Sequence, residues 1–227
     1  ASLLIYLNQG AKKNLESVGA PKEKLAKLFW GSWGVSGDFR PKLKVKSEKL
    51  KIVLYVGILS KRKGLDHLVA AMEDVRKKVP QAKLWLVGPR GDFTPPHMRW
   101  IRVFGAVKNS TLPKFFHKAS VFVLPSVATP TWQEQVGMVN LQALGSGLPV
   151  VTSRSGAIPE FVRAGQGVLL VGERNRRALA EAISKILKFT PQQAARFGRL
   201  GTKFARQHYD PRANIQHIEE VLVTTFR

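Results

Sequence analysis

The residues best suited to chemistry lie between positions 131 and 151, in the segment TWQEQVGMVNLQALGSGLPVV. A carboxylate, Glu134, ends a polar loop, Gly137 opens an amphipathic helix, and an amide, Gln142, lies on the second turn of that helix. The start of a helix presents unpaired backbone N–H groups and a positive dipole end, which together suit a phosphate. A carboxylate and an amide beside those donors can hold sugar hydroxyls, so this segment predicts a site for a nucleotide sugar.

Alternating strands and helices must position this segment. Apolar runs typical of strands covered on both faces occupy residues 52–57, 82–87, 100–104, 121–124, 149–152 and 168–171. Apolar residues at helical spacing predict helices at residues 65–79, 112–118, 137–146, 158–163, 174–188, 191–207 and 211–225. The alternation predicts an α/β fold with a doubly wound parallel sheet. Ligands of such sheets bind at the carboxyl ends of the strands, where we expect segments 57–63, 88–90, 105–107 and 125–137 to converge.

The N-terminal part of the sequence is organised differently. We expect a strand at residues 2–7, a helix at 9–18 and a further apolar run at 27–30. Residues 31–42, GSWGVSGDFRPK, form a glycine-rich connector in which regular structure is not expected.

Composition and charge narrow the class of protein. Of the 227 residues, 44% are apolar and none is cysteine, which favours a globular protein and excludes disulfides and thiolate metal sites. The five histidines have no metal-ligand spacing, and no apolar run reaches the roughly 18 residues that a membrane span needs. The net charge of +22 attracts polyanions. It is open to three interpretations: a solvated basic surface, a membrane- or partner-facing patch around residues 40–51, or nucleic-acid binding, which the lack of a nucleic-acid motif disfavours.

The 131–151 segment resembles the second domain of retaining GT-B glycosyltransferases of family 4, the group 1 glycosyl transferases. Their block reads Glu, seven residues, Glu, then Ala-Met-Ala-x-Gly-x-Pro-Val, and this chain has Glu134, seven residues, Gln142 and then ALGSGLPV. The second Glu of the family is therefore Gln142 here. The resemblance extends over about residues 1–210 and implies a Rossmann-like domain that forms the C-terminal half of a GT-B fold.

The resemblance also implies roles for individual residues. Glu134 would contact the donor sugar near the reacting carbon, although taken alone it reads more simply as a carboxylate that balances a helix dipole. Gly137, Met138 and Val139 would offer backbone N–H groups to the phosphates. Gln142 would face the ribose, where an amide binds a diol more weakly than a carboxylate does, by roughly 1 kcal/mol.

A second block of the family reads Val-Gly-Arg-Leu-x-x-x-Lys-Gly, and this chain has VGILSKRKG at residues 56–64. Lys63 matches the phosphate-binding Lys, Ile58 replaces the Arg, and Arg62 could supply the lost charge. A guanidinium and an ammonium can share a diphosphate, although two surface cations before a helix are the simpler alternative. Trp132 is open to two interpretations, a loop anchor or a platform for the sugar.

Weaker matches concern the nucleotide base. Gly57, Gly88 and Pro89 follow predicted strands, and Val107 closes a Gly-x-Val turn, as in the family's segments that frame the base. Alternatively, Gly88 simply ends a strand and Val107 belongs to the core.

With this resemblance, the chain is expected to be the donor-binding half of a retaining hexosyltransferase of glycan biosynthesis, with Glu134, Lys63 and Arg62 as its catalytic residues. Residues 1–40 would be the end of a missing N-terminal Rossmann domain plus the interdomain connector. Residues 41–210 would form the nucleotide-sugar domain, and residues 211–227 a crossover helix. The expected donor is a UDP-, GDP- or ADP-sugar bound without metal or other cofactor, and the acceptor a glycan, a lipid or a small molecule. We expect a cytoplasmic protein, with peripheral contact at the inner membrane surface as an option. The alternative is a non-catalytic module that binds a nucleotide sugar or a polyanion.

Overall fold

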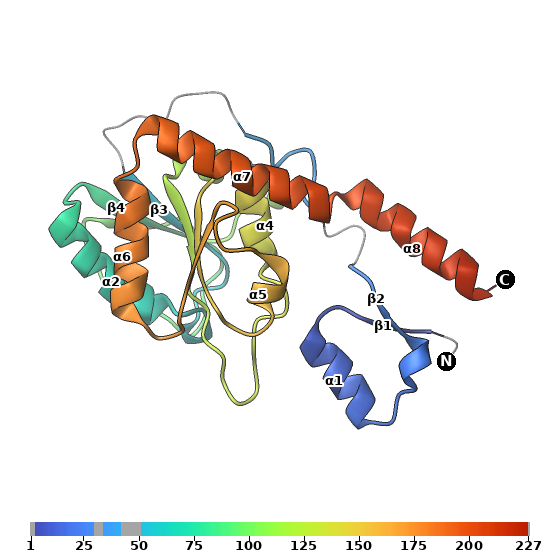
Figure 1. Cartoon of the computed structure of the whole chain (residues 1–227). Helices are drawn as coiled ribbons and strands as arrows, with labels where there is room; N and C mark the ends of the chain where they lie inside the picture. Colours follow the sequence, from blue (N-terminus) through green and yellow to red (C-terminus); the bar gives the residue numbers. More distant parts are fainter. Residues whose placement is uncertain (1–2, 30–33, 42–50, 227) are drawn as a thin grey trace.

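The computed structural model describes residues 3–29, 34–41 and 51–226, and its main body is an α/β domain built on one parallel sheet (Figure 1). The six strands lie in the order β5-β4-β3-β6-β7-β8. Their bounds are β3 Lys51–Val56, β4 Ala82–Val87, β5 Ile101–Val103, β6 Val121–Leu124, β7 Val150–Ser153 and β8 Val168–Val171. The order runs outward in one direction from β3 and then in the other from β6, as in a doubly wound Rossmann-like sheet. The predicted fold class is confirmed.

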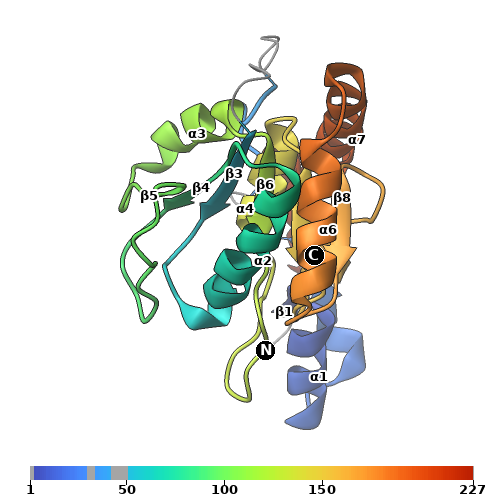
Figure 2. The same cartoon turned by 90° about the vertical axis from the view of Figure 1, so that its left-hand side faces the viewer.

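Helices cover both faces of this sheet. Those of the main body are α2 Leu65–Lys78, α3 Leu112–Lys118, α4 Met138–Gly145, α5 Ile158–Phe161, α6 Arg176–Leu187 and α7 Pro191–Tyr209. Helices α2 and α6 pack side by side on one face (Figure 2), whereas α4 packs against α7. The chain moves outward from β3 to β5 and then crosses back to β6, which reverses the direction of winding. Because parallel crossovers are right-handed, this reversal places α3 and α4 on the face opposite α2.

The core consists of the apolar runs that predicted the strands. Every residue from Ile52 to Val56 in β3 and every residue of β6 is buried, as expected for central strands covered on both faces. Aromatic rings extend this core, since Phe116 of α3 packs edge-on against both Phe39 and Phe122. Phe39 and Val35 belong to the glycine-rich connector, so its described part, residues 34–41, is anchored in the core despite having no regular structure.

Helix α4, whose first residues belong to the candidate site, is held in place by close packing against α7. Gly198 of α7 lies so near the carbonyl of Gly147, just after α4, that a Cβ at position 198 would overlap it. Gly201 approaches Leu144 in the same way, at 2.7 Å from a Cβ position to Cδ2. α7 itself begins with a complete capping box, in which Thr190 and Gln193 bond each other's backbone N–H groups.

The N-terminal part forms a small unit of its own. β1 Leu4–Tyr6 pairs in parallel with β2 Leu25–Lys27, and α1 Gln9–Ser17 connects them. The strand β2 ends at Lys27, the first residue of the apolar run expected at 27–30. The last residue of that run and residue 2 of the first predicted strand lie outside the described part. Phe29, in the apolar run after β2, packs against Phe161 and Tyr209 of the main body. This contact attaches the N-terminal unit to the main body.

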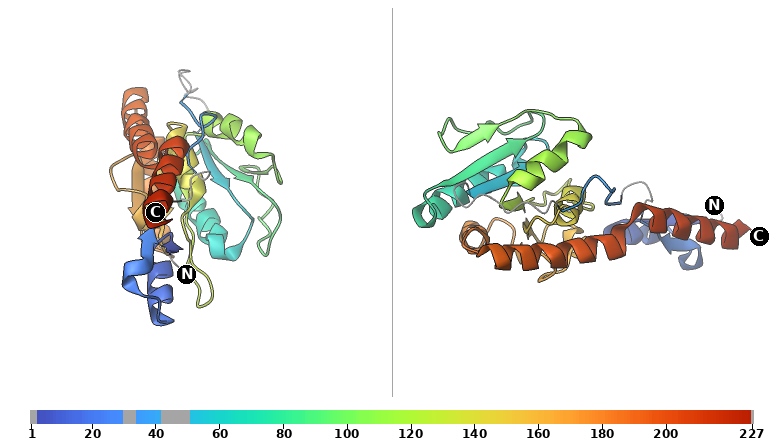
Figure 3. Two further views of the ribbon diagram at one scale, coloured as in Figure 1. Left: turned by 90° about the vertical axis from the view of Figure 1, so that its right-hand side faces the viewer. Right: turned by 90° about the horizontal axis from the view of Figure 1, so that it is seen from above.

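The last helix, α8 Pro211–Phe226, has no buried residue. Together with α7 it forms a long arm that extends past the sheet toward the N-terminal unit (Figure 3). Ile215, Leu222, Val223 and Phe226 of α8 are all exposed. Residues 42–50, which contain most of the basic patch at 40–51, lie outside the described part. The domain boundary predicted between residues 40 and 41 lies directly before this gap.

Candidate functional site

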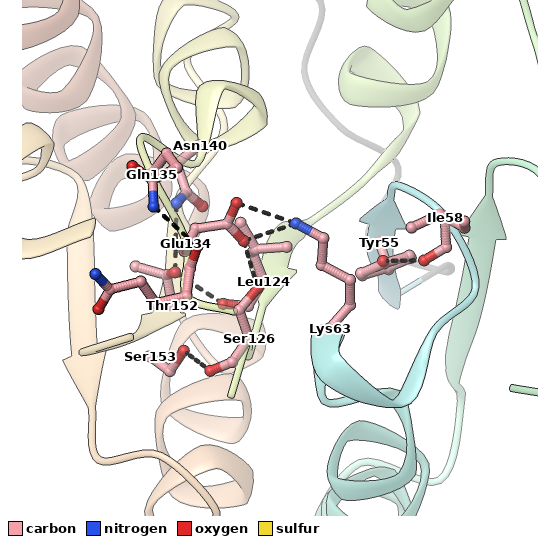
Figure 4. A network of polar contacts seen from close by, with 11 residues as sticks. Tyr55, Ile58, Lys63, Leu124, Ser126, Glu134, Gln135, Asn140, Thr152 and Ser153 are labelled. Atoms are coloured by element: carbon pink, nitrogen blue, oxygen red, sulfur yellow. Dashed lines mark hydrogen bonds and ion pairs between the residues drawn. The ribbon is translucent and has the colours of Figure 1, made fainter. Parts of the chain in front are cut away.

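An ion pair joins the two predicted motifs at the carboxyl end of the sheet (Figure 4). The Lys63 ammonium lies 3.0 and 2.8 Å from the two carboxylate oxygens of Glu134. The Ser126 hydroxyl, which is fully buried, donates to Oε2 of Glu134 at 2.7 Å. The side chains of Lys63 and Glu134 are only 16% and 10% exposed, so the pair is largely removed from water. Two of the three residues predicted to be catalytic, Lys63 and Glu134, are therefore in contact with each other.

The elements on either side explain this placement. Lys63 ends a short 3-10 turn, Lys61–Lys63, directly after β3 and before α2, and Gly64 then adopts a left-handed φ of 70°. The carbonyl of Pro125, at the end of β6, lies so close that a Cβ on Gly64 would overlap it. This close approach brings the β3–α2 turn against the loop that carries Glu134.

The backbone of Glu134 is held by the loop after β7. The Ala157 N–H donates to the Glu134 carbonyl at 2.8 Å. Gly156 has a φ of 52°, and a Cβ there would lie 2.8 Å from the Glu134 nitrogen. Any larger residue at position 156 would push away the loop that carries Glu134. The sequence prediction missed both Ser126 and Gly156. The signal for Gly156 is its position four residues beyond the strand predicted at 149–152, on the same rim as the other loops.

A cavity of about 270 Å³ opens beside the ion pair. It is lined by Val56, Gly57, Lys63, Leu124, Glu134, Gln135, Val136, Gly137, Met138 and Val139. Six residues of the predicted site therefore meet there, from β3, the loop after β6 and the start of α4. Gly137 precedes the first residue of α4 with a φ of 68° and no side-chain cap, which leaves the first N–H groups of the helix facing the cavity.

The remaining predicted binding residues stand around this cavity, not in its wall. Gly88 packs directly against Gly57, since a Cβ on Gly88 would overlap the Gly57 carbonyl. The Gly88 N–H donates to the Gly105 carbonyl at 2.7 Å. Pro89 accepts a bond from Leu59 N–H at 2.9 Å. Val107 is half-buried against the core. Gln142 is half-buried on the second turn of α4, one turn beyond the cavity lining.

Aromatic contacts organise the cations of the site. The guanidinium carbon of Arg62 lies 4.3 Å from the centre of the Trp132 ring, and the Lys63 ammonium lies 4.7 Å from it. Cations at this distance from an aromatic face are attracted by its negative quadrupole. Trp132 therefore contacts the cations themselves, an arrangement that neither interpretation of this residue anticipated.

The residue before the cavity-lining Val56 is Tyr55, whose phenol stays neutral. Tyr55 is fully buried, and its hydroxyl donates to the Ile58 carbonyl at 2.7 Å. Burial, reinforced by the negative charge of Glu134, raises the pKa of Tyr55 far above its usual value. The phenol therefore stays protonated and fixes the backbone at Ile58, the position where the related block has Arg.

A larger hollow of about 490 Å³ lies between α2 and α6, away from the strand ends. Most of its charged groups form ion pairs: Arg176 Nε lies 2.7 Å from Asp74 Oδ2, Lys77 pairs with Asp74, and Arg177 pairs with Glu181. The hydrogen bond from Arg176 lowers the pKa of Asp74 to about 2. In the part of the chain that the structure describes, no three His, Cys, Asp or Glu side chains gather as metal ligands, and no helix is long and apolar enough to cross a membrane.

Comparison with known proteins decides the family. A family model described as glycosyl transferases group 1 matches residues 50–188. The chain belongs to this family. Among the curated relatives, spore coat protein SA of Bacillus subtilis (strain 168) is 28% identical over 194 residues, which is 78% of this chain and 48% of that protein. The GDP-mannose-dependent alpha-(1-6)-phosphatidylinositol monomannoside mannosyltransferase of Mycolicibacterium smegmatis is 29% identical over 182 residues, 75% of this chain and 47% of that enzyme.

Solved structures show the same fold. Anabaena Alr3699/HepE, crystallised in complex with UDP-glucose, matches with a TM-score of 0.78 at 20% identity, over 99% of this chain and 64% of that one. The structural neighbours of this group 1 glycosyltransferase chain are GT-B glycosyltransferases. The chain spans about half the length of the curated relatives that it matches.

Proposed function

We propose that this group 1 glycosyltransferase chain is the donor-binding half of a retaining GT-B hexosyltransferase. The observation that carries the proposal is the Lys63–Glu134 pair beside the uncapped start of α4. Here a carboxylate, an ammonium and free backbone N–H groups face one cavity. These are the groups that a sugar and a diphosphate require.

The proposed reaction begins with exchange of ion-pair partners. When a nucleoside-diphosphate sugar enters, its phosphates compete with Glu134 for Lys63, and the carboxylate turns to the sugar hydroxyls. As the bond from the sugar carbon to the diphosphate oxygen breaks, Lys63, Arg62 and the start of α4 stabilise the negative charge that develops on the leaving group. The acceptor hydroxyl attacks from the face that the diphosphate leaves, which retains the configuration, and its proton passes to the departing phosphate.

The choice of donor follows from the chemistry of the relatives. Alr3699/HepE has been crystallised with UDP-glucose, and the mycobacterial relative uses GDP-mannose by its name. We propose a UDP- or GDP-sugar, with an ADP-sugar as the third option, and a glycan, lipid or small molecule as acceptor.

We further propose that an N-terminal Rossmann domain completes the enzyme. The N-terminal unit and α8 extend from the sheet domain on the same side (Figures 1 and 3), and both carry exposed apolar residues, such as Ile5 and Phe226. Such surfaces are typical of contacts with another domain. Asn8, only 1% exposed, donates to both the carbonyl and the side chain of Gln135, so this unit already contacts the loop that carries Glu134.

The proposal predicts that the chain binds a nucleoside diphosphate without a divalent metal. Isothermal titration with UDP, GDP and ADP in the presence of EDTA should give a dissociation constant of about 10–1000 μM for one of them, because half of the cleft is absent. Heparin, added at the same concentration of negative charge as the nucleotide, should displace the nucleotide only weakly. A strict requirement for Mg²⁺ or Mn²⁺, or heparin binding without nucleotide binding, would favour the polyanion-binding alternative.

A second prediction concerns Gln142. If its amide faces the ribose in the complex, Gln142→Glu should tighten nucleotide binding by roughly 1 kcal/mol, because a carboxylate binds a diol more strongly than an amide does. The same variant should leave the affinity for inorganic pyrophosphate unchanged, since that ligand has no ribose. An equal change for both ligands would place Gln142 away from the ribose, as its position one turn beyond the cavity lining allows.

A further inference from the structure

Trp132 sits on a loop that is fastened to the domain at several points. Its backbone pairs with Thr129 in both directions, through a bond of 2.7 Å from Thr129 N–H and one of 3.3 Å to the Thr129 carbonyl. Just before this turn, the Ala128 N–H donates to the Glu173 carboxylate at 3.1 Å, and Arg174 donates to the Ala128 carbonyl at 3.3 Å. The ring is therefore presented by a constrained turn, not by a free loop tip.

The ring has two cations as its neighbours. Arg62 and Lys63 lie 4.3 and 4.7 Å from its centre, although two like charges at adjacent positions repel each other. Lys63 also has the Glu134 carboxylate, whereas no carboxylate pairs with Arg62 within residues 3–29, 34–41 and 51–226. Trp132 is thus the group that orders the Arg62 guanidinium in the described structure.

An aromatic face and a carboxylate order a cation in different ways. A carboxylate neutralises the charge that it binds, so an arriving phosphate must displace it. An indole ring attracts a cation through its quadrupole and leaves the positive charge available to a second partner. A ring beneath both cations therefore keeps them in place while Lys63 exchanges Glu134 for a phosphate.

We propose that Trp132 is a positioning residue for the donor diphosphate, holding Arg62 and Lys63 so that both charges face the leaving group. The inference rests on the proposed function, because it assumes that a diphosphate binds at this cavity. It assigns Trp132 an effect on phosphate recognition that neither a loop anchor nor a sugar platform would have.

The experiment compares two ligands that differ by one phosphate. Trp132→Leu and Trp132→Phe are prepared in the full chain, and affinities for UDP and UMP are measured by titration calorimetry at fixed ionic strength. Trp132→Leu should weaken UDP binding about 10-fold and UMP binding no more than about 3-fold, because the second phosphate depends most on the two ordered cations. Trp132→Phe should weaken UDP binding less than Trp132→Leu does, because it keeps an aromatic ring, although the quadrupole of that ring is weaker than that of Trp. If the Leu variant fails to fold, this graded loss in the Phe variant decides the question.

Two further variants serve as controls. Trp100 lies 5.6 Å beneath Arg76 at the amino end of β5, so Trp100→Leu removes a similar ring–cation contact far from the strand ends that form the site. It should leave the UDP-to-UMP affinity ratio unchanged. In an Arg62→Gln background, Trp132→Leu should reduce UDP affinity by much less than it does in the native chain.

The outcomes separate the two proposals. If the native chain binds neither UDP, GDP nor ADP, the proposed function fails and the Trp132 assignment fails with it. If the native chain binds UDP, but Trp132→Leu leaves the UDP-to-UMP ratio unchanged and its effect simply adds to that of Arg62→Gln, only the assignment of Trp132 is overturned.

Discussion

Replacing Glu134 by Gln is expected to reduce sugar transfer at least ~100-fold in a two-domain protein that contains this chain, while changing affinity for the nucleoside diphosphate only a few-fold. The substitution keeps the shape of the side chain and an oxygen that can accept the Ser126 hydrogen bond. It removes the negative charge that the proposed mechanism places next to the reacting sugar. Electrostatic contacts that act in the transition state typically contribute factors of about 10²–10³ in rate. The measurement is release of nucleoside diphosphate from a panel of donors and acceptors.

The matched control for this prediction is Glu181→Gln. Glu181 pairs with Arg177 on the exposed face of α6, away from the strand ends, so its loss should leave transfer unchanged. The isolated chain should show no turnover with any substitution, because the acceptor side of the cleft must close over the donor to align it and exclude water. Full activity in the Glu134→Gln protein, or strong transfer by residues 1–227 alone, would contradict the proposed mechanism.

The second large effect concerns the stability of the site. We expect Lys63→Met to lower the free energy of unfolding by about 3 kcal/mol, because it leaves the Glu134 carboxylate buried without a counter-ion. Glu134 as a residue is 8% exposed, so water can compensate only in part for the lost ammonium. Glu134→Gln alone should cost only about 1 kcal/mol, since Lys63 can turn toward solvent and the Trp132 ring remains beneath it. Urea unfolding of the full chain measures both values.

The double variant Lys63→Met/Glu134→Gln tests the physical reason. A neutral amide opposite a thioether carries no unpaired charge, so the double variant should recover most of the stability that Lys63→Met loses. Lys61→Met is the matched control, because Lys61 is exposed two residues away and should have almost no effect. If the two substitutions prove additive, Lys63 and Glu134 do not stabilise each other, and the ion pair is not the organising contact of the site.

Much of the fold was determined by local patterns in the sequence. Continuous apolar runs such as residues 52–57 and 121–124 can only be buried in a sheet covered on both faces, and they are the central strands β3 and β6. The parallel arrangement then places the ends of these strands at one rim. For this reason a Lys after one strand and a Glu after another could be predicted to share a site, although 71 positions separate them.

Other features depended on contacts that no local pattern encodes. β2 is only three residues long and exists because β1 lies beside it, so its apolar content carried little signal. Gly156 and Ser126 matter because their loops touch Glu134, and glycines and serines are common in any turn.

The tertiary structure alone decided what Lys63, Arg62 and Trp132 do for one another. From the sequence, two cations before a helix and a tryptophan in a distant loop were separate features, each with an ordinary explanation. Folding places the ring under both cations and the carboxylate against one of them. The type and approximate position of each group follow from short-range periodicity, whereas pairing across long stretches of chain depends on how closely the backbones of β6, β7 and the start of α2 pack.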